Sequence, residues 1–377
     1  MGSSGTVSLE VKRTEISEIF TPEYPLVDIV FVHGLNGHPK DTWTKNGVFW
    51  PAQLLPKTLN HVQARILTYG YNADVYAFGG KSATSDYIHE HAQTLITTLD
   101  AERYNEDATE RPIIFVAHSL GGILVKRALD YSAAVTNPNI QNLRSVFVST
   151  YGIIFLGTPH NGADPAKWGK MLQSMCQALL PKKILDTKPQ LVDTLKTQSE
   201  TLQNINIGFA NIMDKFHIYL FHEALPTDMG VTREFIVDQT SAGPIMPGPA
   251  YAGIEATHSD MCKFESKNSP GYTAVSSTLK RFSQEASKPI AARWSEEYHL
   301  RDRRNRFKAS ELLGFAGVES RLDTPNAQQD NLSQGPSTGA SPSPGRSKAL
   351  PAPGSESRFD FSVVQVDEND KEMVEER

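Results

Sequence analysis

The stretch Ile113-Ile114-Phe115-Val116-Ala117-His118-Ser119-Leu120-Gly121-Gly122 decides the fold. Its apolar first half predicts a buried strand, and the following Ile123–Leu129 is typical of a helix. A serine on the sharp turn between such a strand and helix indicates a nucleophile elbow. Ala117, in place of the usual glycine, and Gly121 are small enough for that turn. Ser119 is therefore the candidate nucleophile, with helix amides aimed at developing negative charge.

A glycine-containing turn follows a second apolar strand, predicted over Asp28–His33. The residues His33-Gly34-Leu35-Asn36-Gly37 allow the chain to turn sharply and bring a backbone amide beside Ser119. Ester hydrolysis passes through an oxyanion that needs two such donors. We expect the amides of Leu35 and Leu120 to form this oxyanion hole. A plain glycine turn is the alternative interpretation.

The candidate general base is His258. A triad in this kind of fold follows the chain order serine, acid, histidine. Of the eleven histidines, only His258 and His299 follow every plausible acid. His299 lies in a basic segment beside a region of low complexity, which is a poor place for a positioned base. His258 follows the last predicted strand, so chain order favours it.

Three carboxylates could orient the base. Glu223 ends the penultimate predicted strand, where such folds commonly place the acid, and it is our first choice. Asp228 in the next loop and Asp238 after the last predicted strand remain alternatives.

The other histidines and the cysteines do not suggest a cofactor or metal. We expect His33 and His118 to pack at the two turns, and His160 to lie at the pocket rim. His258 and Cys262 are four residues apart, but no second pair of ligands accompanies them. We therefore expect no metal site and no cofactor.

The rest of the chain from about residue 25 to 290 predicts an α/β domain. Short β-branched runs alternate with segments of helical period, including one over Asp86–Leu99, which is typical of a mostly parallel central sheet flanked by helices. The predicted strands are Asp28–His33, Ala64–Thr68, Ile113–Ala117, Ile153–Leu156, Ile218–Phe221 and Glu234–Val237.

A helical insertion is expected at residues 161–216, because the gap between the fourth and fifth strands is too long for a plain crossover. Apolar residues repeat there at helical spacing, namely Trp168, Met171, Leu172, Met175, Cys176, Leu179 and Leu180. The stripe packs on the domain core in one interpretation. In the other it forms a cap or lid over the active site.

Composition excludes several classes of protein. With 37 Lys and Arg against 43 Asp and Glu, the net charge of −6 argues against a nucleic-acid-coating protein. Two distant cysteines exclude a disulfide-built scaffold and favour a reducing compartment. The apolar runs are shorter than the roughly 18 residues of a membrane span, so membrane contact would be peripheral. Residues 1–24 are expected to be a leader, in which Gly2 formally fits an N-myristoylation pattern.

The C-terminal part divides into two segments. Residues 291–318 are expected to form a basic helical segment, with a net charge of +3 between Arg293 and Lys308. Residues 319–377 are rich in Pro, Gly and Ser and then acidic, so we expect a disordered linker and tail. Both segments are candidates for contact with a protein partner, and the basic one also for contact with an anionic surface.

Taken together, these motifs resemble the serine-active-site-containing proteins, a lipase-like family of α/β-hydrolases related to the glycosylphosphatidylinositol inositol-deacylases. The resemblance covers about residues 20 to 285. It implies Ser119 as nucleophile, His258 as base, Glu223 as acid, and Leu35 and Leu120 at the oxyanion hole. It also implies lipid-ester chemistry and a location in the cytoplasm or on an internal membrane, such as that of the mitochondrion or endoplasmic reticulum.

The sequence thus predicts a serine hydrolase that cleaves a carboxylic ester of a lipid or small molecule through an acyl-enzyme. Similar domains also stand at the N-terminus of fungal multidomain proteins. A signalling or interaction module that keeps the hydrolase fold is therefore the alternative.

Overall fold

A computed structural model describes residues 5–73, 84–160, 170–171, 173–175, 177–178, 199–229, 232–237, 239–243 and 248–322. The chain divides into one compact unit, Met1–Phe315, and a second, Ala316–Arg377. The predicted tail beyond residue 322 and Gly2 lie outside the described residues.

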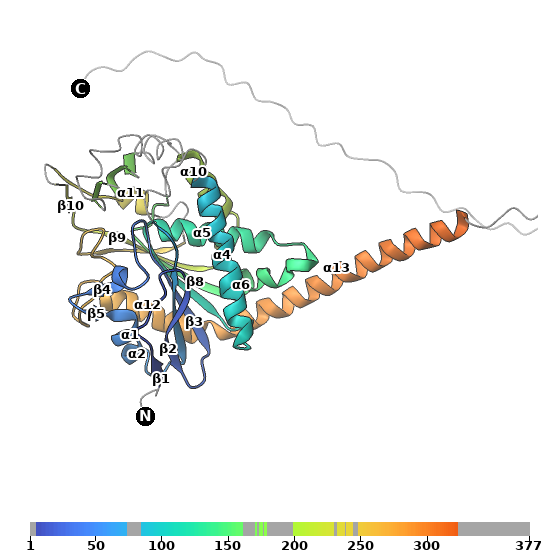
Figure 1. The fold of residues 1–377 in the computed structure, drawn as a ribbon, viewed down its shortest axis with the longest axis horizontal. Coiled ribbons are helices and arrows are strands. Elements are labelled where there is room, and N and C mark those ends of the chain that lie inside the picture. Colours follow the sequence, from blue (N-terminus) through green and yellow to red (C-terminus); the bar gives the residue numbers. More distant parts are fainter. Residues whose placement is uncertain are drawn as a thin grey trace, which may run out of the picture. The chain divides into compact units, whose positions relative to one another are not determined.

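The first unit is built on an eight-stranded sheet in the order β1-β2-β6-β3-β7-β8-β9-β12 (Figure 1). The strands from β6 to β12 are parallel, which confirms the predicted mostly parallel sheet, whereas β1 and β2 join antiparallel. Their bounds are β1 Gly5–Val7, β2 Glu15–Pro22, β3 Val27–Val32, β6 Ala64–Gly70, β7 Ile113–His118, β8 Thr150–Leu156, β9 His217–Glu223 and β12 Ala250–Ile254.

Strand register brings the functional turns to one edge of the sheet. Near the carboxyl ends of the strands, Val32 of β3 pairs with Ala117 of β7, and His118 pairs with Leu156 of β8. Because parallel strands end at the same edge, the segments that follow β3, β7, β8 and β9 meet there.

Helices cover both faces of the sheet (Figure 1). The helices α4 and α10 pack on α5 on one face, and α1, α2 and α12 lie on the other. The predicted helix over Asp86–Leu99 is confirmed as part of α4. The helices are α1 Trp50–Gln53, α2 Leu55–Thr58, α4 Thr84–Asn105, α5 Leu120–Ala134, α6 Ser145–Ser149, α10 Ser199–Ala210, α11 Gln239–Ala242, α12 Tyr272–Glu285 and α13 Ser287–Leu322, with 3-10 helices η1 Asp41–Trp43, η2 Pro138–Arg144 and η3 Met213–Lys215.

The expected leader is wrong where residues 5–7 and 15–22 form two strands of the sheet. In β2, Ile16, Ile19 and Phe20 are buried, and the strand pairs with β6. Without β2, β6 would be the edge strand of this part of the sheet. Pairing with β6 therefore extends the sheet and lets the apolar side chains of β2 be buried.

The expected final strand at Glu234–Val237 is also wrong. Only Arg233–Glu234 is extended, as β11, and it pairs with β10 (Thr227–Asp228) in a separate hairpin. A further hairpin joins β4 (Thr44–Lys45) and β5 (Val48–Phe49). The last strand of the main sheet is β12, whose residues Ala-Tyr-Ala-Gly-Ile carry little β-branched signal.

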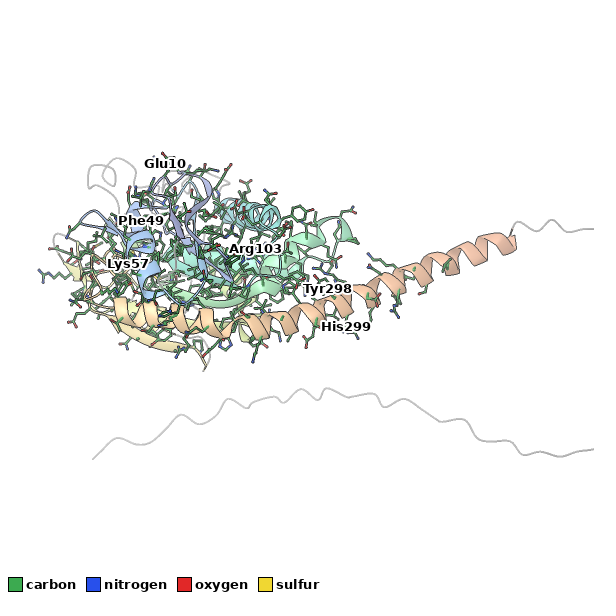
Figure 2. All side chains as sticks on the ribbon, turned by 90° about the horizontal axis from the view of Figure 1, so that it is seen from below. Glu10, Phe49, Lys57, Arg103, Tyr298 and His299 are labelled. Carbon is green, nitrogen blue, oxygen red and sulfur yellow. The ribbon has the colours of Figure 1, made fainter. Side chains whose placement is uncertain are left out.

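A buried ion cluster connects the amino-terminal ends of the strands. Asp28, at 0% exposure, accepts hydrogen bonds from Arg65 Nε at 2.9 Å and Arg111 Nη1 at 3.0 Å, and from Arg103. Figure 2 shows Arg103 within the body of the fold. Burial alone would raise the pKa of Asp28, but these guanidinium groups hold it below its ordinary value. Because it lies at the amino-terminal ends of the strands, the cluster is at the end of the sheet opposite the functional turns.

Candidate active site

Ser119 lies between β7 and α5 in a backbone conformation that residues other than glycine rarely adopt. Its φ is 54° and its ψ is −128°. Three hydrogen bonds hold this turn. Ser119 N donates to Leu156 O at 2.9 Å, and Ser119 O accepts from Gly122 N and Thr158 Oγ1, each at 3.0 Å. The predicted strand, sharp turn and helix are therefore present.

Two glycines allow the turns after β3 and β7 to approach each other. A Cβ atom added to Gly121 would lie 2.2 Å from His33 O, and one added to Gly34 would lie 2.8 Å from Ser119 Cβ. Both distances are too short for any side chain. The turn that carries Leu35 therefore lies directly against Ser119, as the sequence predicts.

His258 reaches the serine from the segment that follows β12. Its Nε2 lies 3.0 Å from Ser119 Oγ, and both residues are 0% exposed. Burial lowers the pKa of His258 well below its ordinary value, and nearby His118 acts in the same direction. The imidazole is thus neutral at pH 7 and can accept the hydroxyl proton. The rejected alternative, His299, lies exposed on α13 (Figure 2).

Of the three predicted acids, Glu223 lies beside the base. It is 1% exposed at the end of β9, and its Oε1 lies 3.8 Å from His258 Nδ1. The same oxygen accepts a hydrogen bond from Val237 N at 2.7 Å. Asp228 is exposed in the β10–β11 hairpin, and Asp238 lies outside the described residues.

The histidines next to the two turns make specific contacts that the sequence does not reveal. His33 Nδ1 lies 3.0 Å from Gly34 O, and its ring stacks on Tyr71 at 4.4 Å. His118 Nε2 lies 3.0 Å from His258 O. Burial lowers the pKa of both His33 and His118 to about 4. These histidines therefore hold backbone groups of the site as neutral side chains.

Met175 of the insertion covers the serine. Its Sδ lies 3.9 Å from Ser119 Oγ, and the side chain is 0% exposed. Of the predicted apolar stripe, Met171 and Met175 are among the described residues, and both are buried. Met171 and Met175 thus belong to the buried apolar core, as in the first interpretation, and Met175 also contacts Ser119. The other members of the stripe lie outside the described residues.

His160 is buried beside Phe155, at 4.8 Å between ring centroids, and burial lowers its pKa. Cys262 Sγ donates to Thr42 O at 3.2 Å, while His258 faces Ser119, so the pair does not converge on a common point. Among the described residues, no three His, Cys, Asp or Glu side chains are grouped as metal ligands.

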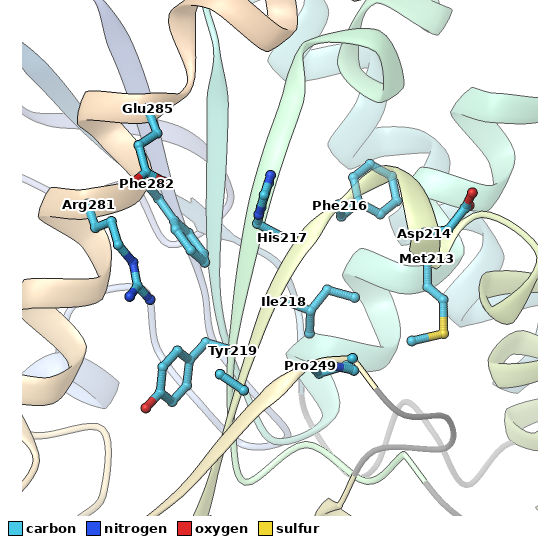
Figure 3. A pocket seen from close by; sticks show the side chains of 12 residues that line it. Met213, Asp214, Phe216, His217, Ile218, Tyr219, Pro249, Arg281, Phe282 and Glu285 are labelled. Atoms are coloured by element: carbon cyan, nitrogen blue, oxygen red, sulfur yellow. The ribbon is translucent and has the colours of Figure 1, made fainter.

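A cavity of about 560 Å³ opens at the amino-terminal ends of β9 and β12 (Figure 3). His217 and Ala250, the first residues of these strands, line it together with Arg281 and Phe282 of α12. The cavity is thus remote from Ser119, which lies at the carboxyl edge. Within the part of the chain that the structure describes, no helix is both long and apolar enough to cross a bilayer.

This mostly parallel sheet flanked by helices has the arrangement of the α/β-hydrolase fold. Residues 29–213 match the model of the alpha/beta hydrolase family. The chain therefore has the α/β-hydrolase fold.

The chain is similar to Protein SERAC1 of Danio rerio, with 27% identity over 262 residues that cover 64% of this chain and 37% of the relative. Protein SERAC1 of Homo sapiens is 26% identical over 266 residues, which cover 64% and 36% of the two chains. These relatives confirm the family resemblance predicted from the motifs. The chain spans little more than a third of their length.

Similar solved structures include a lipase and an esterase. The lipase BlEst2 of Bacillus licheniformis has a TM-score of 0.45 and 18% identity, covering 68% of this chain and 94% of that chain. The Pyrococcus furiosus esterase PF2001 has a TM-score of 0.44 and 12% identity, covering 76% and 92%.

Proposed function

We propose that the protein is a serine hydrolase of carboxylic esters, with Ser119 as nucleophile, His258 as general base and Glu223 as the acid that orients it. The observation that carries this proposal is the 3.0 Å contact between Ser119 Oγ and His258 Nε2 at a strained elbow. The match to the alpha/beta hydrolase family supports hydrolase activity in general.

The reaction follows from this geometry. His258, neutral because it is buried, takes the proton of Ser119 as the oxygen attacks the ester carbonyl. The amides of Leu35 and Leu120 stabilise the oxyanion. His258 then gives the proton to the leaving alcohol, and the ester bond breaks to leave an acyl-enzyme. Water, deprotonated by His258, releases the acid and restores the serine.

Glu223 is suited to stabilise the histidine after it becomes charged. Its side chain is buried, and its Oε1 lies 3.8 Å from His258 Nδ1. The separation of 3.8 Å exceeds a hydrogen bond, so a shift of about 1 Å is needed for direct contact as the imidazole gains its proton. Attraction between the two opposite charges favours that shift.

The surroundings of Ser119 favour an apolar acyl group, so we propose an ester of a lipid or of a small apolar acid as substrate. The carbonyl carbon must approach the nucleophile to about 3–3.5 Å. Met175 Sδ contacts the nucleophile at 3.9 Å from Oγ. Its flexible thioether can shift when a substrate enters, and it offers an apolar surface to the acyl chain.

The test measures hydrolysis of p-nitrophenyl esters of graded acyl length by the full chain, together with labelling by a fluorophosphonate. We expect Ser119→Ala and His258→Ala to lower kcat at least about 10³-fold. Labelling should disappear in Ser119→Ala.

The matched control is His299→Ala, which removes the exposed histidine and should leave turnover unchanged. Full ester turnover by Ser119→Ala would contradict the proposed function. No ester turnover and no fluorophosphonate labelling by the unchanged chain would favour the non-catalytic interaction module instead.

A further inference from the structure

Two neighbouring residues of the elbow contact the same histidine. Ser119 Oγ contacts the imidazole of His258, and His118 Nε2 contacts its backbone oxygen, each at 3.0 Å. The two imidazole rings lie 5.0 Å apart. The elbow between β7 and α5 thus contacts both the side chain and the backbone of His258.

The proton on this second contact is fixed by chemistry. A carbonyl oxygen only accepts, so His118 Nε2 carries the hydrogen and donates it to His258 O. His118 is 5% exposed, and its burial keeps the ring neutral at pH 7. The positive charge of Lys263 also lowers the pKa of His118, and the neighbouring His33 is neutral as well.

The contact matters because the distance from the acid to the base is longer than a hydrogen bond. Glu223 Oε1 is 3.8 Å from His258 Nδ1, and Val237 N already donates to that oxygen. His258 lies in a turn after β12, not in a strand, so sheet hydrogen bonds do not fix it. His118, at the end of β7, connects this turn to the central sheet.

We propose that His118 is a positioning residue that sets the distance between Ser119 Oγ and His258 Nε2 by holding the backbone of His258. This inference rests on the proposed serine hydrolase function. A misplacement of about 1 Å at reacting groups can cost about 10²-fold in rate. Loss of His118 should therefore lower kcat while substrate binding changes little.

The experiment compares His118→Ala with His118→Gln in the full chain, using p-nitrophenyl butyrate over a range of pH. We expect His118→Ala to lower kcat 10- to 100-fold at nearly constant KM. Water admitted to the loosened turn should also raise the pKa of His258, and with it the pH at which kcat/KM reaches half its plateau. Gln keeps an N–H donor of similar reach. It should restore most of kcat and most of the pH midpoint of kcat/KM.

His89→Ala is the matched control, because this histidine lies on α4 and contacts Arg127 instead of the site. It should retain the wild-type rate and pH profile. A His118→Ala enzyme with wild-type kcat and pH profile would overturn the proposal. So would a loss of activity without any pH shift that Gln does not rescue, because packing alone would explain it. Failure of the proposed function is distinguishable, since Ser119→Ala would then remain active.

Discussion

At the scale of single residues, the strained backbone of Ser119 is the most informative feature. A serine with φ near 54° costs on the order of 1–3 kcal/mol. The hydrogen bonds from Thr158 and Gly122, and the one to Leu156, hold it in place. The conformation therefore presents the hydroxyl to His258 at some cost in stability.

The choice of acid is a prediction at the same scale. Glu223→Gln should lower kcat by about 10²- to 10⁴-fold, because the charged imidazole then loses its carboxylate. Asp228→Asn, in the exposed hairpin, should leave kcat unchanged. Steady-state kinetics with a short p-nitrophenyl ester measures both. A larger loss in Asp228→Asn than in Glu223→Gln would assign the acid to Asp228.

The sequence predicts the surroundings of Ser119 well, because local sterics dictate them. Gly121 and Gly34 stand where a Cβ would collide with the opposite turn, so the motif itself encodes the approach. The contacts of His118 with His258 and of Met175 with Ser119 join residues far apart in the chain. No local pattern encodes such pairs, and they emerge only from the packed fold.

At the scale of elements, buried central strands are predictable and edge strands are not. The strands β3, β7 and β8 are buried throughout and read as continuous apolar runs. The edge strand β12 is largely accessible and contains Ala250, Ala252 and Gly253, so it lacks that signal. Ile236 and Val237 are buried without forming a strand, which explains the misplaced final strand.

The helix α13 is attached to the domain by its first turns. Trp294 is 2% exposed and its Nε1 donates to Ser149 Oγ at 3.0 Å, whereas Phe307 further along is 64% exposed. Trp294→Ala should lower the free energy of unfolding by about 3 kcal/mol in urea titrations. Phe307→Ala should change it by less than about 0.5 kcal/mol. Equal effects of the two substitutions would contradict this packing.

At the scale of the whole molecule, buried histidines make stability depend on pH. Burial lowers the pKa of His33 and His118 to about 4, from 6.5. Between these values the unfolded chain binds protons that the folded chain does not, so stability falls as pH falls from 6.5 to about 4. In urea titrations, the free energy of unfolding at pH 5 should be lower than at pH 7 by about 2 kcal/mol for each of these two histidines.

His118→Gln removes one of the two titrating histidines. The loss of unfolding free energy between pH 7 and pH 5 should therefore be smaller by about 2 kcal/mol. Equal stability of the wild-type protein at pH 7 and pH 5 would contradict the prediction.

An aromatic cluster joins the amino-terminal third of the chain to the segment that carries His258. Trp50 Nε1 donates to Cys262 O at 2.9 Å, and its ring packs against Phe31 and Phe264 at 5.2 and 5.0 Å. A fully enclosed indole emits at shorter wavelength than a hydrated one. If the segment around His258 detaches, water reaches Trp50 and its fluorescence shifts to the red. The protein thus contains an intrinsic optical reporter for the placement of its own base.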